Sequence, residues 1–371
     1  MSGETHHVHS ATENSGREAS LLGRLRALSY DRNVLMRLQL EVTKRCNLRC
    51  QHCYVTEQPD GLTSDRIMAL FDEAAEEGCL TVTLTGGEIA LRSDWLELAR
   101  GVRERRMMLN VFTNGTLLSE GDCLDLAALK PMFMGLSLYG PRAEIHDRVT
   151  GVRGSFERTV SAIRRLRALG VTCEIKNVLM HENMACIEET GGLARGLECS
   201  YQFDPTVAPR ADGDCSVLAH RVGGEALREF YMSMVSRKDM DMLSRKACDV
   251  MAQSDPAKGT ATNCSAGFSS IHVEADGNVY PCMGFLPSWG NVNEKSLGEL
   301  WHGPMARQHR ATMQRPLLEC SDCDLLAYCT ARCPRVALVE DGDVSGPSRR
   351  ACEVAGLVKE MHDRLMVYSE S

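Results

Sequence analysis

The chain has 371 residues, of which 43% are hydrophobic and 25% are charged, and its formal net charge is -8. This length and composition predict a folded protein with one large domain or two moderate ones. The acidic balance disfavours nucleic acid as a partner, and no apolar run of about eighteen residues predicts a membrane span. Because no secretion signal is visible, the 17 cysteines predict a cytoplasmic protein whose thiols serve metal binding or catalysis.

Residues 1–34 are a polar tail and lead-in, which we expect to be disordered. A strand-then-helix rhythm follows, in which apolar residues at every second position indicate the strands. Gly78 and Gly170 predict the ends of two helices. The predicted strands are 37–43, 80–88, 108–114, 132–140, 171–180 and 200–209, and the predicted helix starts are Ser64, Ser93 and Ser155.

Six strand–helix units therefore fit between residues 35 and 209, within a predicted domain of residues 35–225. Parallel strands joined by helices predict either a barrel or an open doubly wound sheet. Both folds bind ligands at the carboxyl ends of their strands. Three motifs lie at such ends: a cysteine run after the first strand, GGE after the second and TNGT after the third.

The alternation of predicted strands and helices ends at about residue 210. Residues 226–259 predict a helical linker, and residues 260–355 are loop-rich and cysteine-rich. Within them, two short strand patterns flank the turn residues Asp276-Gly277-Asn278, which predicts one hairpin. A region with so little regular structure needs crosslinks to be stable, and cysteines can provide them. Residues 356–371 predict a C-terminal helix, with an amphipathic pattern that extends back to Val354.

The run KRCNLRCQHC places Cys46, Cys50 and Cys53 within eight positions. Three cysteines cannot all pair in disulfides, and a structural zinc ion needs a fourth ligand that this segment lacks. A [4Fe–4S] cluster has four irons, so three thiolates would leave one iron open to a substrate. The neighbouring Lys and Arg side chains would offset the negative charge of the thiolates.

The spacing C-x3-C-x2-C, followed by an aromatic residue at the end of a first strand, resembles the radical SAM superfamily. The resemblance continues through GGE, TNG and the serine of GLSLYG. In that family GGE contacts the amino group of S-adenosylmethionine, and the serine commonly bonds its ribose or its carboxylate. Ile89 replaces the usual proline, and Tyr139 replaces an Asp found in many relatives. The resemblance assigns cofactor binding to Tyr54, Gly86, Gly87, Glu88, Thr113, Asn114 and Ser137.

The resemblance implies an α/β fold, a partial (β/α)6 TIM-like barrel, with Cys46, Cys50 and Cys53 as ligands of a [4Fe–4S] cluster. The open iron would bind S-adenosylmethionine. One electron would then cleave a sulfur–carbon bond and yield a 5′-deoxyadenosyl radical, which abstracts a hydrogen atom from the substrate. The implied class is a radical SAM oxidoreductase that needs an electron donor such as flavodoxin or ferredoxin.

A second cysteine pattern reads C-x12-G-x4-C, then C-x2-C-x5-C-x3-C, then a last cysteine. It resembles the SPASM extension of radical SAM enzymes, so residues 260–355 are interpreted as a SPASM domain with two auxiliary [4Fe–4S] clusters. The cluster that is assigned Cys264, Cys282 and Cys333 needs a fourth ligand. Either Cys248 provides it, or that cluster stays open to a substrate thiolate. The resemblance assigns Cys320, Cys323, Cys329 and Cys352 to one cluster and Cys264, Cys282 and Cys333 to the other.

Six further cysteines are interpreted as small hydrophobic side chains without a catalytic role, because most lie in or beside apolar patterns. A zinc ribbon is disfavoured as an explanation of the C-terminal pattern, because seven cysteines match the SPASM spacing. The six remaining cysteines are Cys79, Cys123, Cys173, Cys186, Cys199 and Cys215.

Auxiliary clusters can accept an electron from a substrate radical, which predicts an oxidative reaction. The SPASM relatives imply a maturase that forms a thioether or carbon–carbon crosslink in a ribosomally made precursor peptide. Two alternatives share the fold: a dehydrogenase of a small molecule and a sulfatase-type maturase. Sulfatase maturases usually carry an Asp as base where this chain has Met283, which disfavours that alternative. The ordered cofactor motifs disfavour a non-enzymatic iron–sulfur or zinc scaffold.

The catalytic base is not identified, and Asp204 and Asp212, near the end of the last barrel strand, are the candidates. About 35 residues precede the first strand, too few for a leader-recognition domain to fold. We therefore expect either a separate leader-recognition protein or leader-independent binding of the peptide.

Overall fold

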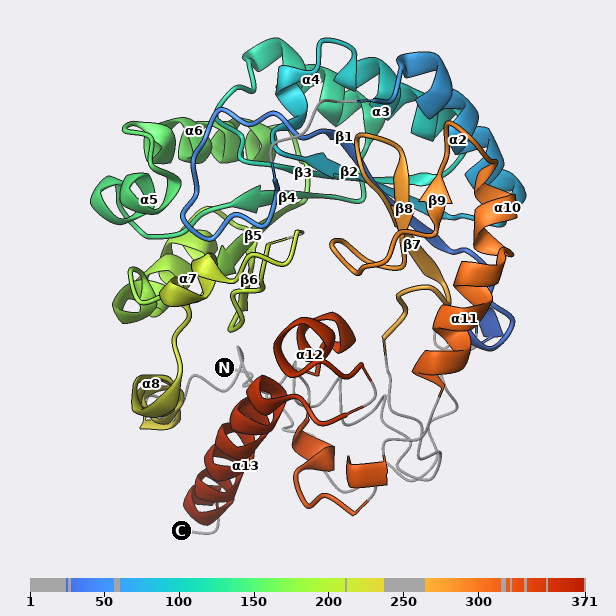
Figure 1. The fold of residues 1–371 in the computed structure, drawn as a ribbon. Helices are drawn as coiled ribbons and strands as arrows, with labels where there is room; N and C mark the ends of the chain where they lie inside the picture. The colour runs from blue at the N-terminus through green and yellow to red at the C-terminus, as the bar shows by residue number, and fades with distance from the viewer. Residues whose placement is uncertain are drawn as a thin grey trace, which may run out of the picture.

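A computed structural model describes residues 25, 28–56, 61–210, 212–236, 264–314, 318–320, 322–329, 332–344 and 346–369. These residues contain a nine-stranded sheet in the order β6-β5-β4-β3-β2-β1-β7-β8-β9. Strands β1 to β6 and β7 run parallel, which confirms the predicted α/β partial barrel (Figure 1). The strands are β1 Arg37–Thr43, β2 Thr81–Gly86, β3 Met108–Thr113, β4 Phe133–Ser137, β5 Cys173–Val178, β6 Ser200–Asp204, β7 Ser270–Val273, β8 Asn278–Tyr280 and β9 Gly290–Asn291.

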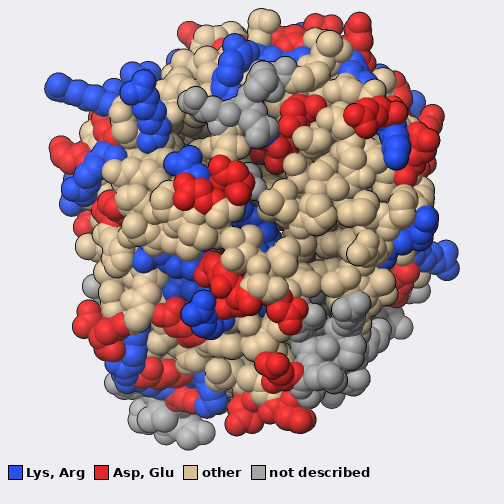
Figure 2. Space-filling model, viewed as in Figure 1, with Lys and Arg blue, Asp and Glu red and all other residues tan. Residues whose placement is uncertain are grey.

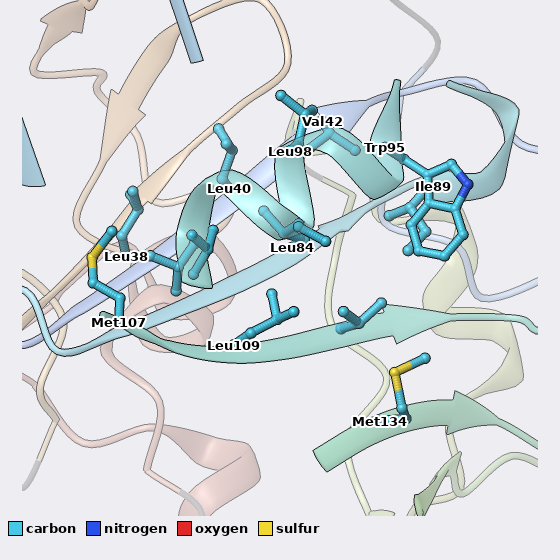
Figure 3. Packing of buried hydrophobic residues seen from close by; sticks show 14 of the residues in the cluster. Leu38, Leu40, Val42, Leu84, Ile89, Trp95, Leu98, Met107, Leu109 and Met134 are labelled. Atoms are coloured by element: carbon cyan, nitrogen blue, oxygen red, sulfur yellow. The ribbon is translucent and has the colours of Figure 1, made fainter. Parts of the chain in front are cut away.

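Alternation along β1 gives the sheet its two faces. Leu38, Leu40 and Val42 are buried in the main hydrophobic cluster, where Leu98 of α3 packs over them (Figure 3). Because side chains alternate along a strand, Glu41 points to the opposite face, toward the barrel interior. The helices are α2 Ser64–Glu76, α3 Trp95–Glu104, α4 Glu120–Leu129, α5 Ala143–Thr150, α6 Ser155–Ala168, α7 Ile187–Gly196, α8 Gly224–Ser236, α10 Leu297–Trp301, α11 Pro304–Met313, α12 Pro334–Asp341 and α13 Arg349–Ser369.

The predicted helix starts are only partly right. Helix α2 begins at Ser64 as predicted, but its cap is Thr63, whose side chain accepts a hydrogen bond from the helix backbone. Helix α3 has Asp94 rather than Ser93 at its N-cap. Gly78, with a φ of 91°, follows the end of α2 as predicted.

Ser155 is the first residue of α6 rather than its cap. The N-cap is Gly154, whose φ of 79° lies in the left-handed region that favours glycine. A side chain from α5 replaces the missing cap: Asp147 accepts hydrogen bonds from the backbone N of Gly154 and of Phe156 at 2.5 and 2.8 Å. Gly170, with a φ of 77°, follows the end of α6 as predicted.

Residues 264–314 hold more regular structure than the loop-rich region that we predicted. The predicted hairpin is confirmed, because β7 and β8 pair antiparallel. Strand β7 also pairs in parallel with β1, with Ile271 opposite Leu38, so the hairpin continues the barrel sheet. Helices α10 and α11 were missed. The capping box of Ser296 and Glu299 at the start of α10 is a local signal that would have revealed it.

Helices α8 and α13 pack against each other through a second hydrophobic cluster that includes Phe230, Tyr231 and Val354. Arg228 of α8 also pairs with Glu360 of α13 at 2.5 Å. The predicted C-terminal helix is therefore confirmed and begins earlier than expected. The predicted tail up to residue 24 and the linker from residue 237 onward, Cys248 included, lie outside the described residues. Within the described part of the chain, no helix has the length and apolar character to cross a membrane.

Trp301 joins α10 to the segment before β1. It is fully buried, its Nε1 donates a hydrogen bond to the carbonyl of Asn33 at 2.8 Å, and the guanidinium of Arg310 lies 4.3 Å from its ring centroid. We predict that Trp301→Ala lowers the free energy of unfolding by about 3–5 kcal/mol, because it leaves a cavity and an unpaired carbonyl. Urea denaturation followed by circular dichroism measures this change.

The matched control is Leu80→Ala, because the Leu80 side chain is 48% exposed. Its free energy of unfolding should stay within about 0.5 kcal/mol of the parent value. Equal losses in the two variants would contradict the assignment of Trp301 to the core.

Candidate active site

The three cysteines of the first motif lie on the loop that follows β1, at the carboxyl end of the barrel strands. The end of α5 anchors this loop: the backbone N of Arg49 donates to the carbonyl of Thr150 at 2.8 Å, and that of Gln51 to Val149 at 3.1 Å. Cys46 is exposed, and the other two cysteines are half-buried. Figure 2 shows a hollow in the middle of this side of the molecule, with Lys and Arg side chains visible inside it.

The three thiols lie within electrostatic range of one another. Burial raises the pKa of Cys50, and the charges of Cys53 and Cys46 raise it further. Although the residue Cys46 is exposed as a whole, partial burial of its thiol raises its pKa, and burial also raises the pKa of Cys53. A thiol with a raised pKa stays protonated unless a positive partner stabilises its thiolate, and metal coordination provides that partner. The donor set therefore fits an iron–sulfur cluster.

The two glycines of GGE let the end of β2 lie directly against the end of β1. A Cβ on Gly86, whose φ is 145°, would come within 2.2 Å of the Thr43 carbonyl oxygen. A Cβ on Gly87 would come within 2.3 Å of the Arg45 carbonyl oxygen. The backbone N of Gly87 donates to Thr43 O at 2.8 Å, and no side chain fits between the two chains. The glycines thus place the third residue of the motif beside the cysteine loop.

The carboxylate of Glu88 is 1% exposed and is held by three donors. These are the hydroxyl of Thr113 at 2.6 Å, the backbone N of Asn114 at 2.7 Å and the backbone N of Ala90 at 3.1 Å. Burial raises the pKa of Glu88, and these hydrogen bonds oppose that rise. Ile89, which replaces the usual proline, is buried in the core. Glu88 is therefore fixed in place, and its contact with a cofactor stays a prediction.

Asn114 braces the cysteine loop. Its Nδ2 donates to Oδ1 of Asn47 at 2.9 Å, and Nδ2 of Asn47 donates to the Thr116 hydroxyl at 2.8 Å. Asn47 lies between the first two cysteines of the loop, and the sequence reading did not assign it a role. Thr113 and Asn114 are both buried, so they support the loop and Glu88 whatever they contribute to ligand binding.

Tyr139 faces the three-cysteine loop. Burial raises its pKa well above the ordinary value, the charge of Cys50 adds to that rise, and a side-chain hydrogen bond with Ser137 opposes it. The ring lies edge-on to His52 at a centroid distance of 4.7 Å. His146 stacks on its other side and accepts a hydrogen bond from the Tyr139 backbone N at 3.1 Å. Ser137 thus lies at the predicted position at the end of β4, with an aromatic neighbour that relatives often lack.

Asp204 and Asp212, the candidate bases, are both exposed and form local turns. Oδ1 of Asp204 accepts a hydrogen bond from Thr206 N at 2.8 Å, and Oδ1 of Asp212 accepts one from Asp214 N at 3.0 Å. Their catalytic role stays a prediction. Arg210, on the same loop, is nearer the chemistry, because its positive charge lowers the pKa of Cys53 against the effect of burial.

A buried polar group lies at the seam between β1 and β7, and the sequence reading missed it. The hydroxyl of Tyr54 donates to Oε1 of Glu41 at 3.4 Å, and Nε2 of His272 lies 3.4 Å from the same oxygen. Next to this pair, Nζ of Lys44 contacts Oε2 of Glu274 at 2.5 Å. Only the pairing of two strands far apart in the sequence brings these residues together.

The cysteines of the C-terminal region form two groups. In the first group, burial raises the pKa of Cys282 to about 12, and the charges of Cys264 and Cys333 add to the rise. Cys333 also raises the pKa of Cys264, after burial as the main cause. These three thiols are the set assigned to one auxiliary cluster, and the fold brings them together.

The second group contains the other four cysteines. Burial raises the pKa of Cys329 to about 11, and the charges of Cys352, Cys320 and Cys323 contribute to the rise. Arg332 lies within electrostatic range of both groups, because Cys320, Cys329 and Cys333 all act on its pKa. The members of each predicted set thus lie within electrostatic range of one another, and their role as cluster ligands stays a prediction.

The described residues contain no three His, Cys, Asp or Glu side chains close enough to hold a single metal ion. Zinc holds its thiolates about 2.3 Å away, and therefore about 3.8 Å from one another. A cluster of four irons separates its cysteines more widely than a single ion does. Of the six cysteines interpreted as hydrophobic, five are buried. Cys215 is exposed, contrary to that interpretation.

Comparison with known proteins supports the interpretation of the chain as a radical SAM enzyme with a SPASM domain. The chain matches the family model "Radical SAM superfamily" over residues 40–194 and the SPASM model, "Iron-sulfur cluster-binding domain", over residues 264–324. The first match spans the strands and loops that bear Cys46 to Ser137. The second contains the hairpin and the first cysteines of the C-terminal groups.

Several curated relatives align with most of the chain. An AdoMet-dependent heme synthase of Methanosarcina barkeri is 26% identical, over 82% of this chain and 92% of that protein. A PqqA peptide cyclase of Ruegeria pomeroyi is 28% identical, over 83% and 85%. The antilisterial bacteriocin subtilosin biosynthesis protein AlbA of Bacillus subtilis is 27% identical over 72% of this chain, but only 60% of its own length is covered.

Solved structures share the fold. Streptococcus suis SuiB bound to precursor peptide SuiA superposes with a TM-score of 0.68 at 16% identity, covering 90% of this chain and 80% of that one. The anSMEcpe structure with bound AdoMet and Cp18Cys peptide gives a TM-score of 0.69 at 19% identity, covering 91% and 99%. The two family matches and the alignments with the curated relatives show that the chain belongs to the radical SAM superfamily and to its SPASM-domain subgroup.

Proposed function

We propose that this radical SAM enzyme oxidatively modifies a ribosomally made precursor peptide by forming a thioether or carbon–carbon crosslink. The observation that carries the proposal is the gathering of two further cysteine groups in a domain whose sheet is continuous with the barrel. Such an arrangement suits a reaction in which an electron leaves the substrate. The likeness to a PqqA peptide cyclase and to AlbA, a bacteriocin biosynthesis protein, supports a peptide as the substrate.

A second candidate function follows from a different relative. The heme synthase of Methanosarcina barkeri aligns over 92% of its length, which favours a small molecule of the tetrapyrrole class as the competing substrate. A sulfatase-type maturase is disfavoured, because Met283 replaces the Asp that usually serves as base.

Cys46, Cys50 and Cys53 would hold the first [4Fe–4S] cluster. When bound, this cluster and S-adenosylmethionine supply a 5′-deoxyadenosyl radical that abstracts a hydrogen atom from the substrate. The chain's own contribution is positional. Asn47 and Asn114 fix the loop, and the buried Tyr139 ring closes one side of it against water.

The C-terminal cysteines would hold the auxiliary clusters in the two sets that the family resemblance assigns. Cys264, Cys282 and Cys333 provide three ligands of one cluster, and Cys248 or a substrate thiolate provides the fourth. Counting iron in a Cys248→Ala protein separates these alternatives, because an unchanged iron content and spectrum would exclude Cys248. An electron donor such as flavodoxin or ferredoxin and a separate leader-recognition protein belong to the same proposal.

Replacing Cys46, Cys50 and Cys53 together with alanine should lower bound iron by about four atoms per chain, since one cubane is lost. Iron analysis of anaerobically reconstituted protein checks this, and 5′-deoxyadenosine should no longer form from S-adenosylmethionine. The auxiliary signals in electron paramagnetic resonance should persist. Cys215→Ala is the control, because Cys215 is exposed and lies outside all three groups. Undiminished deoxyadenosine formation by the triple variant would refute the ligand set.

Co-expression with a candidate precursor peptide encoded beside the gene should yield a peptide lighter by two hydrogens per crosslink. The reason is that hydrogen abstraction and oxidation together remove two hydrogens from the substrate. Intact-mass and fragment mass spectrometry measure the change, and the triple cysteine variant is the negative control. If deoxyadenosine formation were stimulated by a tetrapyrrole and by no peptide, the second candidate function would replace the first.

A further inference from the structure

The seam between β1 and β7 contains a polar group that no step described so far uses. Glu41 is 2% exposed and His272 is 1% exposed, yet both are ionisable and both point toward the barrel interior. Buried ionisable side chains are costly unless they are paired, so their presence calls for a reason. They come from strands more than 200 residues apart in the chain, Arg37–Thr43 and Ser270–Val273.

His272 lacks hydrogen-bond partners. Within the described residues, neither its Nδ1 nor its Nε2 has one, although Nε2 lies 3.4 Å from Oε1 of Glu41. Catalytic hydrogen bonds are often long in ligand-free structures and tighten when a substrate binds. The His272 ring therefore has the capacity to take up one proton, and Glu41 lies where it would stabilise the resulting cation.

The other charged groups next to the pair are Lys44, Glu274 and Asp276. Lys44 is already committed to Glu274, at 2.5 Å, and lies 4.0 Å from Asp276. It is therefore the main cation for two other carboxylates, and His272 is the basic group next to Glu41. One proton gained by the pair gives an imidazolium–carboxylate ion pair with no net charge, which is the arrangement that a low-dielectric site tolerates.

Tyr54 places the pair between the two cysteine regions. Its hydroxyl donates to Glu41, and its pKa is raised by burial and then by the charges of Glu41, Cys53 and Cys282. Cys53 belongs to the first cluster loop, and Cys282 belongs to an auxiliary group. The pair therefore lies beside the interval that an electron crosses when it leaves a substrate at the barrel mouth for the C-terminal domain.

A base is needed in that interval. Loss of one electron from a substrate radical during crosslinking is accompanied by loss of one proton. Met283 cannot accept it, and the exposed Asp204 and Asp212 side chains are engaged in their own turns. No other residue given a catalytic role above fills this need.

We propose that Glu41 and His272 act as the proton-accepting pair for the oxidation of the substrate radical, with Tyr54 holding Glu41 in position. This rests on the proposed function. The substrate first gives a hydrogen atom to the 5′-deoxyadenosyl radical, which becomes 5′-deoxyadenosine. As the crosslink forms, one electron passes to the auxiliary iron–sulfur group and one proton to the pair, so two hydrogens leave the substrate.

The test uses reconstituted holoenzyme and the precursor peptide that is modified in the co-expression experiment, deuterated at the reacting carbon. Glu41→Gln and His272→Gln keep the side chains polar and nearly isosteric but remove their capacity to take up the proton. Both should transfer deuterium to 5′-deoxyadenosine within about threefold of the parent rate. Crosslinked product should fall roughly 100-fold, the typical contribution of a positioned base.

Two readouts separate chemistry from structure. Freeze-quenched electron paramagnetic resonance should show an organic substrate radical that accumulates in the Gln variants, and Glu41→Asp should restore part of the crosslinking. Iron content and the thermal unfolding midpoint establish that each variant is folded and loaded. Thr83→Val, a half-buried residue of β2 whose hydroxyl contacts only Asn110 among the described residues, is the matched control and should crosslink normally.

Unchanged crosslinking in both Gln variants would overturn the pair while leaving the proposed function intact. A parallel fall of deuterium transfer and crosslinking would also overturn it, because it would show a role in placing the substrate. If the parent enzyme crosslinks no peptide, the proposed function fails first, and the pair falls with it.

Discussion

The buried carboxylate of Glu88 is the contact on which the geometry of the site depends. Its side chain accepts hydrogen bonds from Thr113 and Asn114 at the end of β3, and its backbone N donates to Arg45 in the cysteine loop. One residue thus ties together the ends of β1, β2 and β3. A buried carboxylate is tolerated here because three donors replace its water. The contact exists only because Gly86 and Gly87 let the two strand ends touch.

The pairing of β7 with β1 has a comparable effect on the rest of the molecule. Because it continues the barrel sheet, the C-terminal hairpin is held by backbone hydrogen bonds and not by side-chain packing alone. Cys282 follows β8, and Cys53 lies on the loop after β1, so both cysteines belong to segments that leave the same sheet, in which β7 separates the two strands. A rigid link of this kind suits electron transfer, which requires a constant separation between donor and acceptor. It also creates the seam at which Glu41 and His272 meet.

Features that depend on local pattern were predictable from the sequence. The six barrel strands follow from the alternation of apolar residues. Features that depend on contacts between distant segments were not predictable. The brace between Asn47 and Asn114 and the pair of Glu41 and His272 join residues separated by 67 and by more than 200 positions, and no period connects them. The local turns formed by Asp204 and Asp212 were not predictable either, because the sequence does not distinguish an Asp that forms a turn from an Asp in an active site.

The seam also bears on the choice between substrates. A substrate radical that loses one electron must also lose a proton or, if it bears a carboxylate, lose that group as neutral carbon dioxide. In crosslinking a proton leaves, and a base must receive it. In an oxidative decarboxylation carbon dioxide leaves, and no base is needed. The His272 imidazole, which has no hydrogen-bond partner among the described residues, lies buried beside the Glu41 carboxylate, and this pair is the base that we propose for the first route. The proposed role of the polar seam therefore belongs to the crosslinking route, on which it depends.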